Sequence, residues 1–90
     1  MDKQINIKVF GKVQGVYFRQ STKDKADYLG LKGVVMNSAD GSVYISVRGD
    51  EEKLQKFVSY CKIGPEMSEV INVLVEDEEL KDFKSFSILR

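Results

Sequence analysis

Hydrophobic residues recur along the chain with two periods, one typical of strands and one typical of helices. In the segments 4–10 and 43–47 they alternate with polar residues, which predicts two half-buried strands. In the segments 18–29 and 54–61 they recur every three or four residues, which predicts two helices with one buried face each. The expected buried helix positions are Phe18, Thr22, Ala26, Leu29, Leu54, Phe57, Val58 and Cys61.

Glycine and proline residues separate these elements. Gly30 follows the first helical segment and Gly64-Pro65 follows the second, so both helices are expected to end there. Asp40-Gly41 is a strong turn signal between the apolar segments 34–37 and 43–47, which therefore form a hairpin. The chain is thus predicted to run as strand, helix and hairpin, followed by a second helix.

Two further strands are predicted in the C-terminal third of the chain. EVINVLVE, residues 69–76, is strongly apolar, and FKSFSILR, residues 83–90, places Phe86 and Ile88 on one face. The order is β-α-β-β-α-β with the last strand split or extended, and right-handed crossovers put both helices on one side. We therefore expect an α+β ferredoxin-like sandwich, with an antiparallel sheet and two helices packed on one face. No linker, repeat or low-complexity tract interrupts it, so residues 1–90 are expected to form a single domain.

The charge of the chain is balanced overall but uneven along its length. Lys and Arg number 14 and Asp and Glu number 14, whereas a dedicated nucleic-acid binder is usually basic. Residues 1–48 carry eight basic and four acidic side chains, so this part is positive and the remainder is negative. An anion is favoured near the N-terminal part, although ordinary solvated faces explain the same pattern.

Cys61 is the only cysteine of the chain, and histidine does not occur. A disulfide framework is thereby excluded, and the commonest general base and metal ligand is missing. Cys61 falls on the apolar side of the second helix, where a buried thiol is more usual than a nucleophile. The acidic run 76–79 has no metal-ligand spacing and is typical of a solvated connection, so neither a metal nor a cofactor is expected.

Signals for a membrane or an assembly are not evident in the sequence. No apolar run approaches transmembrane length and the chain does not open with a signal-peptide pattern. We therefore expect a cytoplasmic protein with no membrane partner. The small size and the lack of an obvious exposed apolar stripe favour a monomer.

The segment GKVQGVYFRQ, residues 11–20, joins the first strand to the first helix. Free backbone N–H groups and the positive end of the helix dipole converge at such a junction. Gly15 allows the backbone to turn and approach a ligand, and Arg19 offers paired donors to a phosphate or carboxylate. The segment therefore suits an anion, although an ordinary turn with a surface arginine is the commoner explanation of the spacing alone. The Gly-Lys-Ser/Thr ending of a nucleotide P-loop does not follow.

Any catalysis on this framework has to proceed without histidine, a reactive thiol or a metal. A substrate with a good leaving group meets that condition, and in an acyl phosphate the leaving group is a carboxylate. A polar residue is then needed to orient a water near the loop. Asn37, at the end of the first hairpin arm, is the candidate, although taken alone it is better explained as an ordinary residue beside a turn.

Two segments together resemble the acylphosphatase family. GKVQGVYFR, residues 11–19, looks like the first signature of the family, and GVVMNSADGSVYISVRG, residues 33–49, resembles the second. The likeness extends to the element order, to YLGLKG, to Gly64-Pro65 and to the closing SFSILR, so it covers nearly the whole chain. The resemblance implies hydrolysis of the carboxyl-phosphate bond of small acyl phosphates to a carboxylate and inorganic phosphate, without a metal or a phosphoenzyme.

The resemblance also implies roles for individual residues. Arg19 would bind the substrate phosphate and stabilise its developing charge, and Asn37 would orient the attacking water. Backbone N–H groups of five consecutive residues would complete the phosphate site. These residues are Gln14, Gly15, Val16, Tyr17 and Phe18.

Val34 and Met36 depart from the second signature, which usually has an aromatic residue and a polar or basic residue at these positions. Neither departure replaces Arg19 or Asn37, so activity is still expected, and the departures bear on rate and substrate affinity.

Two alternatives stay open at this point. One is a non-catalytic module of the same fold that binds an anion such as carbamoyl phosphate, as acylphosphatase-like domains do within larger maturation proteins. The other is a small RNA-binding sandwich that stacks bases on Phe10, Tyr17 or Tyr44. Zero net charge and the lack of a basic-aromatic strand motif argue against the RNA-binding alternative.

Overall fold

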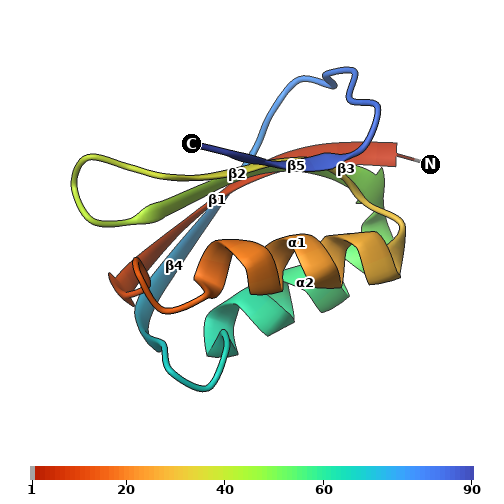
Figure 1. The fold of residues 1–90 in the computed structure, drawn as a ribbon. Coiled ribbons are helices and arrows are strands. Elements are labelled where there is room, and N and C mark those ends of the chain that lie inside the picture. Colours follow the sequence, from red (N-terminus) through yellow and green to blue (C-terminus); the bar gives the residue numbers. More distant parts are fainter. Residues whose placement is uncertain (1) are drawn as a thin grey trace.

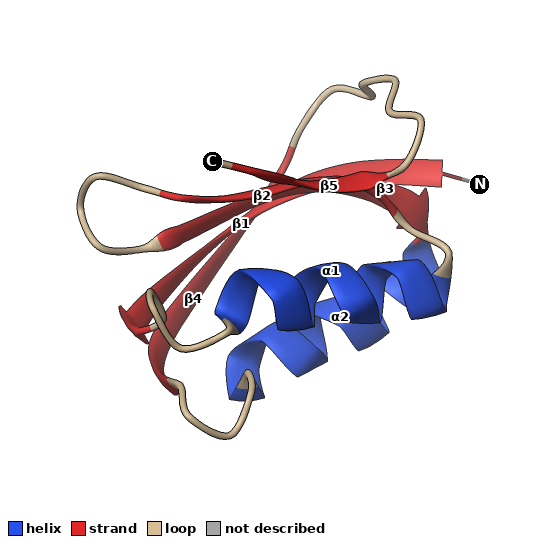
Figure 2. Cartoon of the chain, viewed as in Figure 1, coloured by secondary structure: helices blue, strands red, loops and turns tan. Residues whose placement is uncertain are grey.

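The computed structural model describes residues 2–90, and its elements follow the order β-α-β-β-α-β-β. The strands are β1 (Asp2–Lys12), β2 (Lys32–Asn37), β3 (Val43–Asp50), β4 (Glu69–Asp77) and β5 (Phe86–Leu89). The helices are α1 (Phe18–Leu29) and α2 (Glu51–Ile63). Both helices cover the same face of the sheet (Figure 1, Figure 2). The predicted α+β ferredoxin-like sandwich is confirmed.

The sheet has the strand order β4-β1-β3-β2-β5 and is mixed, not wholly antiparallel. β3 pairs antiparallel with β2, as the predicted hairpin requires, and β1 pairs antiparallel with both β3 and β4. β5 pairs with β2 in parallel, with Ile88 beside Val35, which corrects the expectation of an antiparallel sheet at this edge. The reason is that the connection 78–85 carries the chain across the helix-free face to the far edge, where β5 runs in the direction of β2 (Figure 1).

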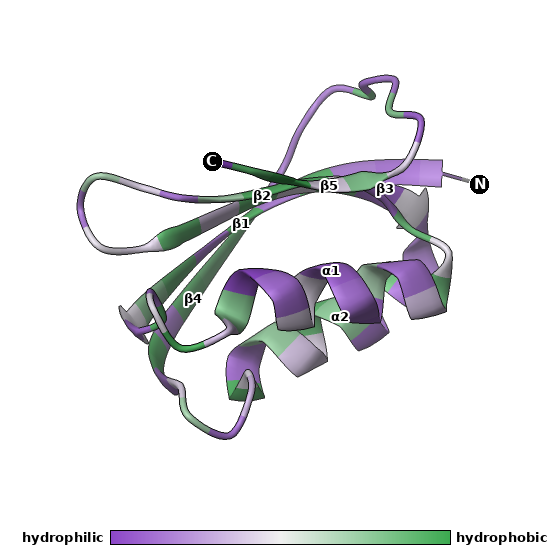
Figure 3. Cartoon of the chain, in the orientation of Figure 1, coloured by the Kyte–Doolittle hydropathy of each residue, from purple (hydrophilic) through white to green (hydrophobic). Residues whose placement is uncertain are grey.

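The predicted hydrophobic faces are buried between the sheet and the helices. β1 and β3 pair in a register that sets Ile7 opposite Ile45, and both side chains are fully buried. Phe57 of α2 packs edge-on against Phe86 of β5, with ring centroids 6.0 Å apart. Each fully buried side chain of this kind stabilises the fold by about 1.5–3 kcal/mol. Figure 3 shows hydrophobic and hydrophilic residues mixed along both the strands and the helices, as expected for elements with one buried face.

The helix positions expected to be buried are confirmed almost without exception. Among them, Val58 is partly buried and packs against the core. The fully or nearly fully buried positions are Phe18, Thr22, Ala26, Leu29, Leu54, Phe57 and Cys61.

α2 follows β3 without an intervening loop, and acidic residues occupy its N-cap and the start of its first turn. The Asp50 carboxylate, at the N-cap, accepts a hydrogen bond from the backbone N–H of Glu52 at 3.2 Å. Glu51 and Glu52 place two more carboxylates in the first turn, where they complement the helix dipole. Among the described residues, neither helix is long and apolar enough to span a bilayer.

The connection 78–85 is fixed to the helix-free face by Glu78. One carboxylate oxygen of Glu78 accepts hydrogen bonds from the Gln4 side-chain amide, at 3.0 Å, and from the Ser46 hydroxyl. Burial raises the pKa of Glu78, but the hydrogen bonds from Ser46 and Gln4 outweigh burial and hold the pKa below its ordinary value. The acidic run 76–79 is therefore more than the solvated connection that the sequence predicts, because one of its carboxylates is half-buried and structural.

Candidate active site

The loop 13–17 joins β1 to α1 and carries a row of unbonded backbone N–H groups. Two of its residues, Gly15 (φ 73°) and Tyr17 (φ 69°), have left-handed backbone conformations. This conformation costs a tyrosine on the order of 1–2 kcal/mol, and such strain concentrates at functional sites. Within the described chain, the N–H groups of residues 14–18 donate to no backbone carbonyl. A ligand with several acceptor oxygens satisfies a set of donors of this kind.

α1 begins at this loop without a side-chain cap. Tyr17 occupies the N-cap position, its side chain makes no capping hydrogen bond, and no acidic residue stands in the first turn. The partial positive charge of the helix N-terminus is therefore not compensated by the helix itself. The first turn instead carries Arg19. The helix terminus and the guanidinium attract the same kind of ligand, an anion.

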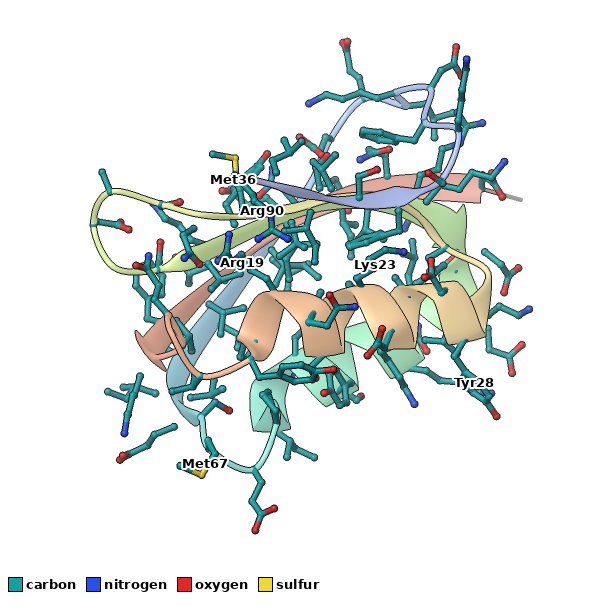
Figure 4. The ribbon with its side chains drawn as sticks, in the orientation of Figure 1. Arg19, Lys23, Tyr28, Met36, Met67 and Arg90 are labelled. Atoms are coloured by element: carbon teal, nitrogen blue, oxygen red, sulfur yellow. The ribbon has the colours of Figure 1, made fainter. Side chains whose placement is uncertain are left out.

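Arg19 lines a small concavity of about 130 Å³ between the start of α1 and the sheet. A second arginine, Arg90, lines it from the end of β5, and in Figure 4 the two labelled arginines lie close together near the start of α1. Neither arginine forms an ion pair with a carboxylate of residues 2–90. The remaining lining residues are Val13, Gly15, Tyr17, Phe18, Gln20 and Ile88. Two guanidinium groups beside free N–H groups suit a phosphate.

Sequence reasoning misses Ile88 and Arg90 because they lie at the opposite end of the chain from the loop. The parallel pairing of β5 with β2 is what carries them to the start of α1. A usable signal is nevertheless present in the closing segment. Phe86, Ile88 and Arg90 are every second residue and therefore share one face of the closing segment. The burial of Phe86 shows that this face is turned toward the helices.

Asn37 is the last residue of β2 and lies where the β2–β3 hairpin begins to turn. It is paired with Val43 of β3. Its side-chain oxygen Oδ1 is buried and has no hydrogen-bond partner among the described residues. A buried acceptor left without a donor costs roughly 1–3 kcal/mol. This oxygen therefore marks a place where a bound water or ligand supplies the donor.

The hairpin turn beyond Asn37 is held by Asp40. One carboxylate oxygen of Asp40 accepts hydrogen bonds from the Ser42 backbone N–H, at 3.0 Å, and from the Ser42 hydroxyl, and the other lies 3.1 Å from Lys8 Nζ. The hydrogen bonds from Ser42, together with Lys8, lower the pKa of Asp40 to about 2. Asp40 is therefore ionised at all but strongly acidic pH, and the turn keeps its internal bonds over that range.

The loop 13–17 and the hairpin are joined by Gln14. The side-chain amide of Gln14 donates to the carbonyl oxygens of Ser38, at 2.8 Å, and Ser42, at 2.9 Å. Ser38 directly follows Asn37, so these hydrogen bonds bring the two predicted parts of the site together. Asn37 itself does not line the concavity beside Arg19.

The other predicted loop residues take different positions. Gly15, Tyr17 and Phe18 line the concavity, and Gly15, which has no side chain, can contribute only its backbone. Val16 is partly buried and packs against the core, and Phe18 is 1% exposed. Two apolar side chains therefore anchor the loop on either side of the exposed Tyr17.

Other features of the molecule do not offer the same chemistry. Burial raises the pKa of the Cys61 thiol to about 12, so Cys61 is not a nucleophile near neutral pH. A larger groove of about 440 Å³ lies beside α1 and α2 and contains Tyr17, Tyr28 and Tyr60. The same groove contains one carboxylate, Asp24, and one ammonium group, Lys25, so it lacks the excess of positive charge found beside Arg19 and Arg90. In the part of the chain that the structure describes, no group of three or more His, Cys, Asp or Glu side chains is placed to hold a metal ion.

Val34 and Met36, the two departures from the second signature, lie away from the concavity. Val35 between them is fully buried against the helices, so both neighbours are on the opposite, helix-free face. Met36 is labelled on that face in Figure 4. The concavity is on the helix side, because the first turn of α1 lines it. Neither departure therefore contacts it.

Comparisons with known proteins identify the family to which the chain is related. The family model for acylphosphatase matches residues 5–88. The acylphosphatase of Thermotoga petrophila is 44% identical over 86 residues, which are 96% of each chain. The crystal structure of the acylphosphatase from Bacillus subtilis is 40% identical, has a TM-score of 0.94, and is matched over 100% of both chains. Full-length HypF, in its phosphate- and nucleotide-bound form, has the same TM-score of 0.94 and 33% identity over 100% of this chain, but over 12% of its own chain.

The comparisons agree with the resemblance seen in the sequence. The family match covers both segments, 11–19 and 33–49, on which the resemblance was based, and the solved relatives share the whole fold. The resemblance is therefore confirmed, and with it the hydrolase class. The chain belongs to the acylphosphatase family.

Proposed function

We propose that the chain hydrolyses small acyl phosphates by direct attack of water on phosphorus, with the substrate phosphate held at the start of α1. The observation that carries this proposal is that the uncapped N-terminus of α1 and Arg19 meet at one small concavity. The N–H groups of residues 14–18 bind the phosphoryl oxygens. Arg19 binds the same group and stabilises the charge that develops on it in the transition state.

Asn37 orients the attacking water in this proposal. Its buried Oδ1 lacks a donor, and a water that donates one hydrogen to it keeps a lone pair free for phosphorus. The bond from the water oxygen to phosphorus forms as the bond from phosphorus to the acyl oxygen breaks, and that electron pair leaves with the carboxylate. The proton of the water passes to an oxygen of the substrate's own phosphate. The products are a carboxylate and inorganic phosphate, and a separate general base is not required.

The proposal extends to the state of the protein. Residues 1–90 act as one domain and as a monomer in the cytoplasm, and the reaction requires neither metal nor cofactor. Neither nucleic acid nor membrane is a partner. Light scattering on a purified sample checks the monomer, and a mass of two chains contradicts it.

Hydrolysis of benzoyl phosphate in the presence of a chelator tests the reaction. Turnover is expected, and a rate at the uncatalysed background contradicts the enzymatic proposal.

Asn37→Ala tests the role of the amide, because it should lower kcat by roughly 10²-fold while the inhibition constant of inorganic phosphate stays within about twofold. An equal loss of phosphate affinity contradicts the assignment of Asn37 to the water.

A second candidate function is a non-catalytic module that binds an anion such as carbamoyl phosphate. The likeness to HypF favours it, because the matching region is 12% of that much longer protein, whose structure is phosphate-bound. The two candidates share phosphate binding and differ in turnover. Calorimetric binding of inorganic phosphate without hydrolysis of benzoyl phosphate or carbamoyl phosphate selects the second.

A further inference from the structure

The side chain of Gln14 contacts the β2–β3 hairpin, whereas its backbone N–H belongs to the proposed phosphate site. Its Nε2 donates to the carbonyl oxygen of Ser38 at 2.8 Å and to that of Ser42 at 2.9 Å, across sequence separations of 24 and 28 residues. The group is half-buried, and both of its N–H hydrogens are used. One amide therefore spans the mouth of the β2–β3 hairpin.

The hairpin is internally fixed by bonds that do not involve the loop. The Ser38 N–H donates to the Ser42 carbonyl at 2.8 Å, and Asp40 accepts from Ser42 and pairs with Lys8 of β1. The Ser38 and Ser42 bonds hold the shape of the turn and the Lys8–Asp40 pair ties it to β1, but none of these contacts is made by a residue of the loop 13–17. Among residues 2–90, the side-chain hydrogen bonds from that loop to the hairpin are the two made by Gln14. Both segments lie at the same end of the molecule (Figure 1).

Asn37 stands directly before one of the two carbonyl acceptors. Consecutive Cα atoms are about 3.8 Å apart, so a shift of the Ser38 carbonyl moves Asn37 with it. The Asn37 Oδ1, buried and without a donor, has to meet a water at one position relative to the phosphate. A displacement on the order of 1 Å in such an arrangement lowers a rate about 10²-fold.

We propose that the Gln14 side chain is a positioning residue, which sets the distance between the backbone phosphate site and the water held by Asn37. The inference rests on the proposed role of Asn37. Gln14 joins the two halves of the site within one residue, since its N–H belongs to the phosphate loop and its side chain holds the hairpin. Its side chain acts on the chemical step through Asn37 and does not touch the phosphate.

Gln14→Met tests the proposal, because methionine is of similar length and has no N–H groups. The kcat for benzoyl phosphate should fall roughly tenfold to hundredfold, the effect of two lost hydrogen bonds. Inhibition by inorganic phosphate should stay within about twofold, since the backbone donors are kept. Gln55→Met, the same change on the exposed side of α2, is the matched control and should leave kcat unchanged.

A double-mutant cycle separates positioning from a merely structural role. In the Asn37→Ala background, Gln14→Met should lower kcat by less than about twofold, because the residue through which it acts is already removed. Independent, multiplying effects of the two changes overturn the proposal, as does a parallel loss of phosphate affinity in Gln14→Met alone. An Asn37→Ala enzyme with full kcat instead contradicts the proposed function, so the two failures are distinguishable.

Gln14→Glu serves if Gln14→Met does not fold, since glutamate has the shape of glutamine. At neutral pH its carboxylate would face two carbonyl oxygens and repel them, whereas the protonated form restores one donor. The kcat relative to the wild type should therefore rise as pH falls through the pKa of the new carboxyl. A ratio that does not change with pH overturns the proposal.

Discussion

The two helices of this molecule begin in opposite ways, although both follow a strand and pack on the same face of the sheet. α2 starts directly after β3, with Asp50 capping the N–H of Glu52 and acidic residues in the first turn. α1 starts after the loop 13–17, with a strained Tyr17 at the N-cap, no side-chain cap and Arg19 in the first turn. The protein satisfies one helix terminus with its own carboxylates and leaves the other for a ligand.

This difference shows how a small fold separates stability from binding. A side-chain cap stabilises a helix by about 0.5–2 kcal/mol, and α1 forgoes that contribution. The positive φ of Tyr17 is a further local cost of about 1–2 kcal/mol. The buried face of α1, with Phe18 and Ala26 fully or nearly fully buried, offsets these losses. The terminus of α2 has no such task and is optimised for the fold alone.

Among the variants that test the contrast between the two helix termini, Arg19→Ala should have the largest effect on activity. The kcat/KM for benzoyl phosphate is expected to fall by ~10³, because the guanidinium stabilises charge that develops in the transition state. Lys53→Ala removes a cation from the first turn of α2 and is the matched control, with activity unchanged. Steady-state kinetics of both variants check this, and an Arg19→Ala enzyme within about tenfold of the wild type contradicts the phosphate role.

Gly15→Ala, compared with Gly30→Ala, separates the cost of backbone strain from the effect on phosphate binding. Gly15 and Gly30 share a φ of 73°, and a Cβ at either meets no atom within 4 Å. Alanine at either position should therefore lower the free energy of unfolding by about 1–2 kcal/mol. Only Gly15→Ala should weaken phosphate inhibition, by about tenfold, because it shifts donors to an anion. Equal phosphate affinity in the two variants would remove Gly15 from the site.

Asp50→Ala tests the capped terminus. The free energy of unfolding should fall by about 1 kcal/mol, since the N–H of Glu52 loses its acceptor. Activity should be unchanged, because α2 begins away from the concavity that Arg19 lines. Urea denaturation and benzoyl phosphate turnover measure the two effects. A loss of activity without a loss of stability would mean that the termini are not independent.

Gln20→Glu makes the first turn of α1 resemble that of α2. A carboxylate here lines the concavity and repels the substrate, so KM should rise about threefold to tenfold. In the wild type, Asp24 accepts a hydrogen bond from Gln20 at 2.9 Å. In the variant, two carboxylates would repel each other there and oppose the gain at the helix dipole, so the free energy of unfolding should change by less than about 0.5 kcal/mol. Gln55→Glu on α2 is the control. A lowered KM would contradict an anion site at this terminus.

The parts of this contrast that the sequence predicts are those encoded over a few residues. The position of Arg19 in the first turn of α1 follows from the helical period, which begins at Phe18. The contacts of Gln14 do not, because its partners lie 24 and 28 residues away. Arg90 joins the site only because β5 docks parallel to β2, and strand order is not written in a local pattern.

β4 shows the same limit for burial. EVINVLVE is strongly apolar and predicts a strand, which the structure confirms as Glu69–Asp77. The strand is nevertheless at the edge of the sheet, and Ile71 and Leu74 are 77% and 49% exposed. Apolar composition indicates the conformation of a segment, but its neighbours decide how much water it meets.

Cys61 is a built-in probe of how often the core of this protein opens. Its thiol is fully buried on the inner side of α2, and its pKa of about 12 keeps the reactive thiolate scarce. A thiol reagent therefore reaches it only when α2 separates from the sheet. The rate of labelling in native buffer measures how often that opening occurs. The chain has no second cysteine to confuse the signal. Labelling can thus report, variant by variant, whether a slow enzyme has lost its chemistry or its fold.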